Sequence, residues 1–167
     1  VLAPGIIEAE NRERGWKMLR DSIEVIRRHA GYACGRVSFK LGPHAVYTCS
    51  PEFLTEIQNV ASKLNVGVHI HLAESKEMAR RVKGRYGVSE VKLLDKIDFL
   101  KPNVIAAHCI RLSKEDMLLI AKNGVKVAYN PVANMKLALG APKILDLTRL
   151  GVTVGLGTDG PASNNSL

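Results

Sequence analysis

The segment Val66-Gly-Val-His-Ile-His-Leu-Ala-Glu74 carries most of the information about the fold. Its first seven residues form a largely apolar run, which predicts a buried strand over 66–72. His69 and His71 are two residues apart and therefore point to the same face of that strand. Glu74 follows where the strand should end. A histidine at the end of a strand, with a carboxylate just beyond it, can hold a metal ion and move a proton beside it.

Two further segments repeat this arrangement of an apolar run that ends in a polar side chain. Ala-Ala-His-Cys at 106–109 places His108 at the end of one predicted strand. Gly-Leu-Gly-Thr-Asp-Gly at 155–160 places Asp159 just beyond another. The sequence therefore predicts three strand ends that could contribute to one site.

Helical and strand patterns alternate along the chain. Ser50 and Ser113 are typical helix caps, and Pro51 suits the first helical position. Helical spacing covers 9–30, 51–64, 75–86, 89–97, 114–123 and 142–150, and apolar runs predict strands over 36–41, 66–72, 104–107, 125–129 and 152–156. Continuous apolar strands separated by helices indicate a parallel α/β sheet.

The candidate polar residues all follow the carboxyl ends of predicted strands. This is the face that carries the active site in a TIM (β/α)8 barrel, and it is also where an open doubly wound sheet binds its ligand. The clustering alone fits both folds. A complete barrel needs about 250 residues, so the 167 residues of this chain could form only part of one.

Composition narrows the classes of function. A hydrophobic content of 46% is enough for one domain with a core. The net charge of +8 could indicate a nucleic-acid partner, but the basic residues lie mostly on predicted helix faces, mixed with acidic ones. We therefore expect solvated helices and no nucleic-acid binding.

The cysteines and the apolar segments bear on the cellular location. Cys34, Cys49 and Cys109 are an odd number without close spacing, which favours a reducing compartment over a disulfide framework. No segment approaches the roughly 20 apolar residues of a membrane span, and residues 1–8 lack a charged leader. We expect a cytoplasmic protein without membrane contact, and both ends of the sequence look like cuts within a longer chain.

Each candidate residue also has a purely structural interpretation. His69 would lie one layer deeper than His71, where it would pack in the interior, although the two could form a bidentate metal motif. Glu74 could be a helix-start carboxylate or a proton shuttle. His108 could be a buried histidine bonded to a carbonyl or could orient a water molecule. Asp159 could ligate a metal and accept a proton.

Three other features of the sequence allow more than one interpretation. His44, in Gly-Pro-His-Ala-Val-Tyr-Thr, falls in a loop, as a turn residue or a hydrogen-bonding partner of substrate. Residues 155–160 also match the dinucleotide fingerprint, but Pro161 and polar residues follow where that fingerprint requires an apolar helix. Cys109 and His108 should face opposite ways on a strand, which disfavours a nucleophilic pair.

Taken in order, the motifs resemble those of the amidohydrolase superfamily, in its branch of chlorohydrolases and methylthioadenosine/S-adenosylhomocysteine deaminases. The likeness extends from about residue 37 to the C-terminus. It is carried by the segments around His44, His71, His108 and Asp159, and by Asn-Pro-Val-Ala-Asn-Met-Lys-Leu-Ala-Leu-Gly at 130–140.

The resemblance implies a metal-dependent hydrolase that holds one divalent ion, zinc or alternatively iron. By motif position, His71 and Asp159 correspond to metal ligands, and Glu74 to the acid and base that also contacts the substrate ring. His108 corresponds to the histidine that faces the hydrolytic water, and His44 to a substrate-binding histidine. The implied reaction removes ammonia from the ring of an aminopurine nucleoside or a related heterocycle.

This sequence lacks the family's first-strand His-X-His, which supplies two metal ligands. The chain 1–167 therefore corresponds to a partial catalytic domain, and we expect it to be inactive alone and to pair its open sheet edges with a second copy. Two alternatives remain open. One is action on another heterocycle, by triazine dechlorination or by guanine or cytosine deamination, and the other is a non-catalytic relic or assembly module.

Overall fold

The computed structural model describes residues 1–9 and 11–164, in which strands and helices alternate. The strands are β1 (Gly5–Ile6), β2 (Lys40–Pro43), β3 (Gly67–Leu72), β4 (Val104–His108), β5 (Lys126–Tyr129) and β6 (Val154–Leu156). The helices are α1 (Arg12–His29), α2 (Pro51–Lys63), α3 (Lys76–Tyr86), α4 (Glu90–Lys96), α5 (Lys114–Lys122), α6 (Pro131–Lys136) and α7 (Ile144–Arg149). The chain divides into two units, Val1–Ile70 and His71–Leu167.

Serine side chains begin four of the helices in the described part of the chain. Each serine hydroxyl accepts the backbone N–H of the third helical residue, which satisfies a donor that has no partner within the helix. The pairs are Ser50 with Phe53, Ser75 with Met78, Ser89 with Lys92 and Ser113 with Asp116. These local caps explain why the helix starts could be predicted from sequence.

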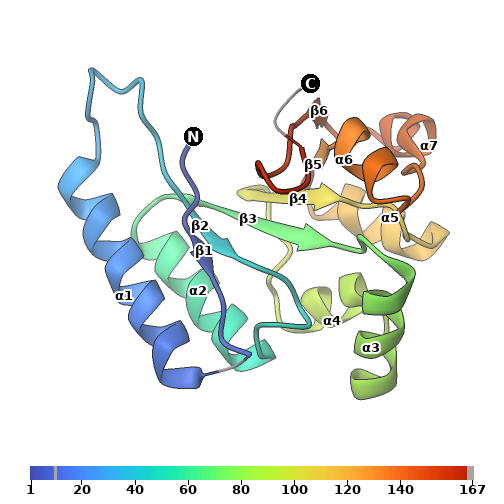
Figure 1. The fold of residues 1–167 in the computed structure, drawn as a ribbon, viewed down its shortest axis with the longest axis horizontal. Coiled ribbons are helices and arrows are strands. Elements are labelled where there is room, and N and C mark those ends of the chain that lie inside the picture. The colour runs from blue at the N-terminus through green and yellow to red at the C-terminus, as the bar shows by residue number, and fades with distance from the viewer. Residues whose placement is uncertain (10, 165–167) are drawn as a thin grey trace. The chain divides into compact units, whose positions relative to one another are not determined.

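The first unit pairs β1, β2 and β3 in parallel, with Gly5 opposite Gly42 and Lys40 opposite Gly67. Its helices α1 and α2 lie side by side (Figure 1), and the ring centroids of Trp16 and Phe53 are 5.1 Å apart. The core is apolar and includes Ile6, Leu41, Phe53, Leu54, Ile57 and Val68.

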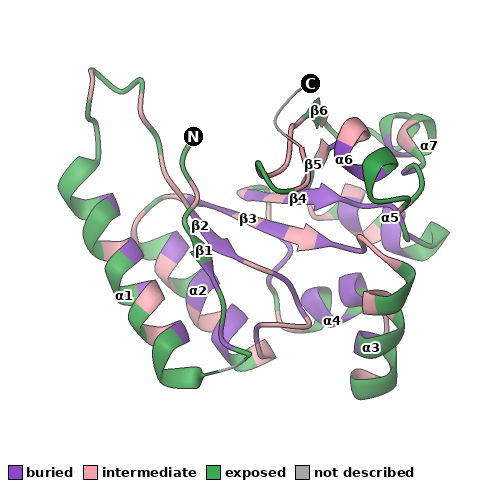
Figure 2. Cartoon of the chain, in the orientation of Figure 1, coloured by how far each residue is buried: buried purple, intermediate pink, exposed green. Residues whose placement is uncertain are grey.

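The second unit pairs β4, β5 and β6 in parallel, with Ala106 opposite Val127 and Ala128 opposite Gly155. The strands β3 and β4 are mostly buried, whereas the outward faces of helices such as α3 are exposed (Figure 2). Its core includes Leu72, Leu94, Phe99, Val104, Ile120 and Leu147. Because parallel strands end at one edge, the loops after β4, β5 and β6 leave the sheet on the same side.

The structure differs from the sequence-based prediction in three places. The predicted strand 36–41 begins only at Lys40 and runs to Pro43, because Ala33 and Cys34 adopt left-handed backbone angles in the preceding turn. Strand β1 was not predicted, since two residues give no periodicity and its partners lie in β2. Helix α6 was not among the predicted helices, and it has no side-chain cap that could have indicated it.

None of the helices in the described part of the chain is both long enough and apolar enough to cross a lipid bilayer.

Candidate metal and catalytic centre

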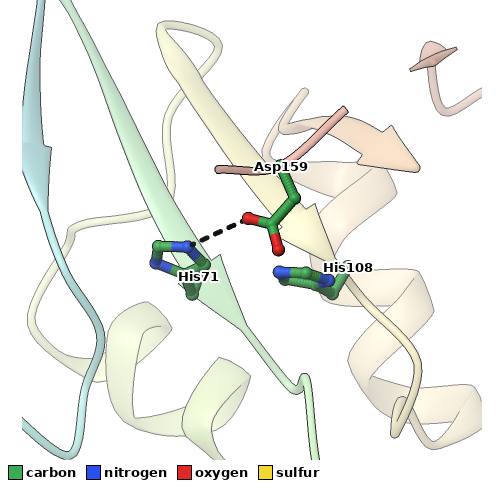
Figure 3. Close-up of side chains that lie close together, drawn as sticks. All are labelled: His71, His108 and Asp159. Carbon is green, nitrogen blue, oxygen red and sulfur yellow. Dashed lines mark ion pairs between the residues drawn. The ribbon is translucent and has the colours of Figure 1, made fainter. Parts of the chain in front are cut away.

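Three side chains from separate strand ends meet within the second unit. His71 is the last residue but one of β3, His108 ends β4, and Asp159 lies in the loop after β6. One ligand atom from each can be chosen so that all three lie within 4.8 Å of one another. The Asp159 carboxylate points toward the two imidazole rings (Figure 3). Residues that lie 37 to 88 positions apart in the sequence are thus brought to one point.

The two histidine rings lie almost parallel beside the carboxylate. Their centroids are 5.5 Å apart with an interplanar angle of 21°. The distance from Nε2 of His71 to Oδ1 of Asp159 is 4.0 Å. The side chain of His108 is fully buried, whereas those of His71 and Asp159 are 35% and 16% exposed. The cluster therefore has one buried wall and an accessible side.

The backbone at these strand ends is held in the left-handed region. The φ angles are 49° at Ala73, 71° at His108, 52° at Cys109 and 67° at Asp159. Such angles cost a non-glycine residue about 1–3 kcal/mol each and are concentrated at functional sites. Hydrogen bonds between the strand ends stabilise this backbone: the N–H of Cys109, after β4, donates to the carbonyl of Leu72, at the end of β3, at 3.0 Å.

His108 is oriented by a buried amide. Its Nδ1 lies 2.8 Å from Oδ1 of Asn134, in helix α6, and Asn134 is 1% exposed. An amide oxygen only accepts, so Nδ1 carries the hydrogen and a neutral ring presents the lone pair of Nε2 to the cluster. Among the described residues, that buried Nε2 has no hydrogen-bond partner. A buried acceptor in this state is suited to a metal ion or a water molecule.

Asp159 is held by its own loop. Its Oδ2 accepts a hydrogen bond from the hydroxyl of Ser163, and the amide of Asn164 donates to the carbonyl of Thr158 at 3.1 Å. These contacts leave Oδ1 on the side that faces His71. The rest of the motif noted in sequence, from Asn165 onward, lies outside the described residues.

The start of this loop fits closely against β5. A Cβ atom at Gly157 would lie 2.4 Å from Oδ1 of the buried Asn130. Glycine therefore lets the chain pass Asn130 on its way to Asp159, and the N–H of Gly157 donates to the carbonyl of Tyr129 at 2.9 Å. The close approach to Asn130 explains why position 157 is a glycine, which could not be inferred from the sequence.

The donor set fits a divalent metal ion. Two imidazole nitrogens and a carboxylate oxygen are ligands that zinc takes in catalytic sites, with further positions open to water or substrate. The unpartnered Nε2 of His108 supports this fit, because a buried lone pair without a partner is costly. The sequence predicted His71 and Asp159 as ligands, and the structure adds His108 to the same cluster.

The other predicted residues take different positions. Glu74 Oε1 lies 3.9 Å from Nε2 of His108, at the edge of the cluster. His69 is only half-buried and is not a member of the cluster. His44 lies in the first unit directly after β2, where its Nδ1 is 2.9 Å from the hydroxyl oxygen of Thr48. A role for His44 in binding substrate stays a prediction.

Two rival interpretations of the motifs are not supported. Cys109 is fully buried, burial raises the pKa of its thiol far above the ordinary range, and its sulfur donates to the carbonyl of Ala106. It is therefore unsuited to act as a nucleophile with His108. After β6, no helix begins within the residues described up to Asn164, so the glycines of 155–160 do not form a dinucleotide-binding turn.

Comparison with known proteins agrees with this geometry. The sequence profile described as "Amidohydrolase family" matches residues 8–167. A 5'-deoxyadenosine deaminase from Methanococcoides burtonii is 46% identical over 166 residues, which is 99% of this chain and 38% of that protein. A 5-methylthioadenosine/S-adenosylhomocysteine deaminase from Desulforudis audaxviator is 44% identical over 155 residues, which is 93% of this chain and 36% of that protein.

The fold is found in solved structures as well. A crystal structure of an adenosine deaminase from Xanthomonas campestris with bound zinc superposes with a TM-score of 0.88 at 28% identity, covering 99% of this chain and 38% of that one. The predicted fold class, a partial TIM (β/α)8 barrel with parallel strands, is thus confirmed. The chain spans little more than a third of the length of these relatives, and it belongs to the amidohydrolase family.

Proposed function

We propose that the protein, at its full natural length, catalyses the hydrolytic deamination of an adenosine-like nucleoside. The observation that carries this proposal is the cluster of His71, His108 and Asp159, with the Glu74 carboxylate 3.9 Å from His108. Metal ligands beside a proton-carrying carboxylate suit the displacement of an amino group by water. The names of the curated relatives supply the substrate class, an adenosine derivative with a modified 5' position.

His71 and Asp159 would hold one divalent ion, zinc or alternatively iron, with the Nε2 atom of His108 beside it. When bound, the ion would supply Lewis acidity and make a water molecule easier to deprotonate. The relative of known structure that carries zinc supports the choice of zinc.

Each side chain then has a distinct task. His108 presents the lone pair of Nε2 and orients the attacking water, because Asn134 fixes the hydrogen on Nδ1. Asp159 accepts a proton from that water, and Glu74 protonates the ring nitrogen next to the carbon under attack. A carbon–oxygen bond forms, the proton taken up by Asp159 passes to the amino group, and the carbon–nitrogen bond breaks with release of ammonia. The second proton of the water returns to Glu74. His44 would bind the substrate.

The test is ammonia release by the zinc-loaded protein from methylthioadenosine, S-adenosylhomocysteine and adenosine. We expect release from at least one of them, and Glu74→Gln should lower kcat by roughly a hundredfold or more. Glu77→Gln is the matched control, because Glu77 is an exposed carboxylate three residues away that pairs with Arg81. Absence of release from all three would leave triazines, guanine or cytosine as substrates, or a non-catalytic role.

The isolated chain should behave differently from the whole protein. We expect it to be inactive alone, because a complete catalytic site in this family also uses a His-X-His pair. Strands at a sheet edge carry unpaired backbone groups, and a second copy could pair with them. Gel filtration of the isolated chain would report such a homo-oligomer. A cytoplasmic location and the absence of a nucleic-acid partner also remain predictions.

A further inference from the structure

Glu90 is a buried carboxylic acid that the proposed mechanism does not use. It is the first residue of α4 and is 4% exposed, unlike most glutamates at a helix start. Its Oε2 accepts the backbone N–H of Ala73 at 3.1 Å, across 17 residues of sequence. Its Oε1 has no hydrogen-bond partner among the described residues. The side chain is therefore turned inward toward the end of β3.

Ala73 is the turn residue between the cluster and Glu74. Its φ of 49° is left-handed, so the chain reverses direction within one residue after β3. The carbonyl of Ala73 accepts the N–H groups of Ile110 at 3.0 Å and Arg111 at 2.8 Å. Because the N–H of Ala73 donates to Glu90, both the N–H and the carbonyl of Ala73 are hydrogen-bonded. The direction in which Glu74 leaves this turn depends on these contacts.

The surroundings of Glu90 make it a costly residue to bury. The pKa of Glu90 is raised to about 7, mainly by desolvation; the N–H of Ala73 opposes this shift, and the charges of Glu74 and Asp116 contribute to it. A cavity of about 180 Å³ adjoins it and is also lined by Lys83 and Arg111. No ion pair between Glu90 and either cation is present in the described structure.

Asp116 does not form a hydrogen bond with Glu90, because both of its carboxylate oxygens accept hydrogen bonds from other residues. Its Oδ1 accepts the hydroxyl of Ser89 at 2.5 Å, and its Oδ2 accepts the N–H of Ser113 at 3.0 Å. A buried acid that lowers stability while it contacts the edge of a candidate active site is typical of a functional position.

We propose that Glu90 is a positioning residue: by accepting the N–H of Ala73 it fixes the turn that presents the Glu74 carboxylate to His108. This inference deepens the proposed function and rests on Glu74 acting as the proton carrier. Glu74 must remain near Nε2 of His108, now 3.9 Å from its Oε1. A shift of about 1 Å in a catalytic group can cost roughly a hundredfold in rate.

The test compares three variants of the protein at its full natural length and loaded with zinc. Glu90→Met keeps the volume and removes the acceptor, whereas Glu90→Gln keeps an oxygen acceptor and removes the charge. Glu77→Met is the control on an exposed glutamate. Hydrogen exchange at the Ala73 amide reports the hydrogen bond, and kcat and KM for deamination report the position of Glu74. Circular dichroism verifies that each variant is folded.

We expect Glu90→Met to speed exchange at Ala73 by about tenfold and to lower kcat by on the order of tenfold or more with little change in KM. Glu90→Gln should retain both values within about threefold, since the acceptor remains. Equal exchange in all variants would overturn the proposal, as would faster exchange with an unchanged kcat. A Glu90→Gln variant as impaired as Glu90→Met would also overturn it, because the charge and not the acceptor would then matter.

Failure of the proposed function looks different. If the unsubstituted protein releases no ammonia, the deaminase proposal fails, and the exchange rates at Ala73 alone decide whether Glu90 holds the turn.

Discussion

Asn134 holds His108 from behind, with 2.8 Å between its Oδ1 and the Nδ1 of the ring. Both side chains are buried, so neither group can exchange this contact for water. The contact selects which ring nitrogen faces the cluster of His71, His108 and Asp159. An orienting partner of this kind, outside the set of ligands, typically changes metal affinity or activity by 10–100-fold when removed, a magnitude on the order of 1–3 kcal/mol.

Asn134→Leu should therefore lower the proposed deaminase activity by about tenfold or more, because the ring of His108 can then adopt the other tautomer. Nitrogen NMR of the imidazole measures the tautomer directly and should show hydrogen on Nδ1 in the unsubstituted protein. Asn123→Leu, at the end of α5, is the control. An unchanged tautomer in Asn134→Leu would show that the amide does not orient the ring.

Gly157 lies so close to Asn130 that any larger residue at this position should destabilise the protein. Gly157→Ala should destabilise the protein by about 1–3 kcal/mol and reduce zinc content, because its Cβ would collide with Asn130 and displace the loop of Asp159. Thermal unfolding and elemental analysis measure the two effects.

Gly155→Ala provides the matched comparison, since a Cβ there meets nothing within 4 Å. A double variant, Asn130→Ala with Gly157→Ala, should recover part of the lost stability. Similar losses in Gly155→Ala and Gly157→Ala would contradict the steric explanation.

Glu90 predicts a pH-dependent stability. Its folded pKa is raised from 4.5 to about 7, so the native state holds a proton that the unfolded state releases between these values. The contribution of Glu90 to the free energy of unfolding is then fully present below pH 4.5 and is lost as the pH rises through about 7. Glu90→Gln should remove this slope and raise stability at pH 8 by on the order of 3 kcal/mol.

Urea unfolding of Glu90→Gln and of the unsubstituted protein at pH 5 and at pH 8 measures this difference in stability. Glu115→Gln is a suitable control, since Glu115 is exposed and its pKa is lowered rather than raised. Parallel pH dependences for Glu90→Gln and the unsubstituted protein would show that this carboxyl does not titrate as described.

The order of helices and strands could be predicted because its signals are local. Ser50 and Ser113 cap their helices through residues only three positions away. Parallel strands separated by helices then place their carboxyl ends together, which brought His71, His108 and Asp159 to one edge without knowledge of any contact. The motifs therefore sufficed for the fold class and for the members of the cluster.

Other features depend on contacts between distant residues and left no local signal. Asn134 reaches His108 only because six residues from Pro131 form a helix without a side-chain cap. Glu90 has the sequence context of an exposed helix start, yet it turns inward to Ala73. The strand β1 has only two residues and is defined by its pairing with β2.

The central claim is that His71 and Asp159 bind one divalent ion beside His108, and metal analysis tests it most directly. His71→Ala and His29→Ala, a histidine on the exposed face of α1, are to be purified at full natural length and compared for zinc and iron. We predict that His29→Ala retains the metal content of the unsubstituted protein and that His71→Ala loses most of it. Equal metal content in the two variants would contradict the account.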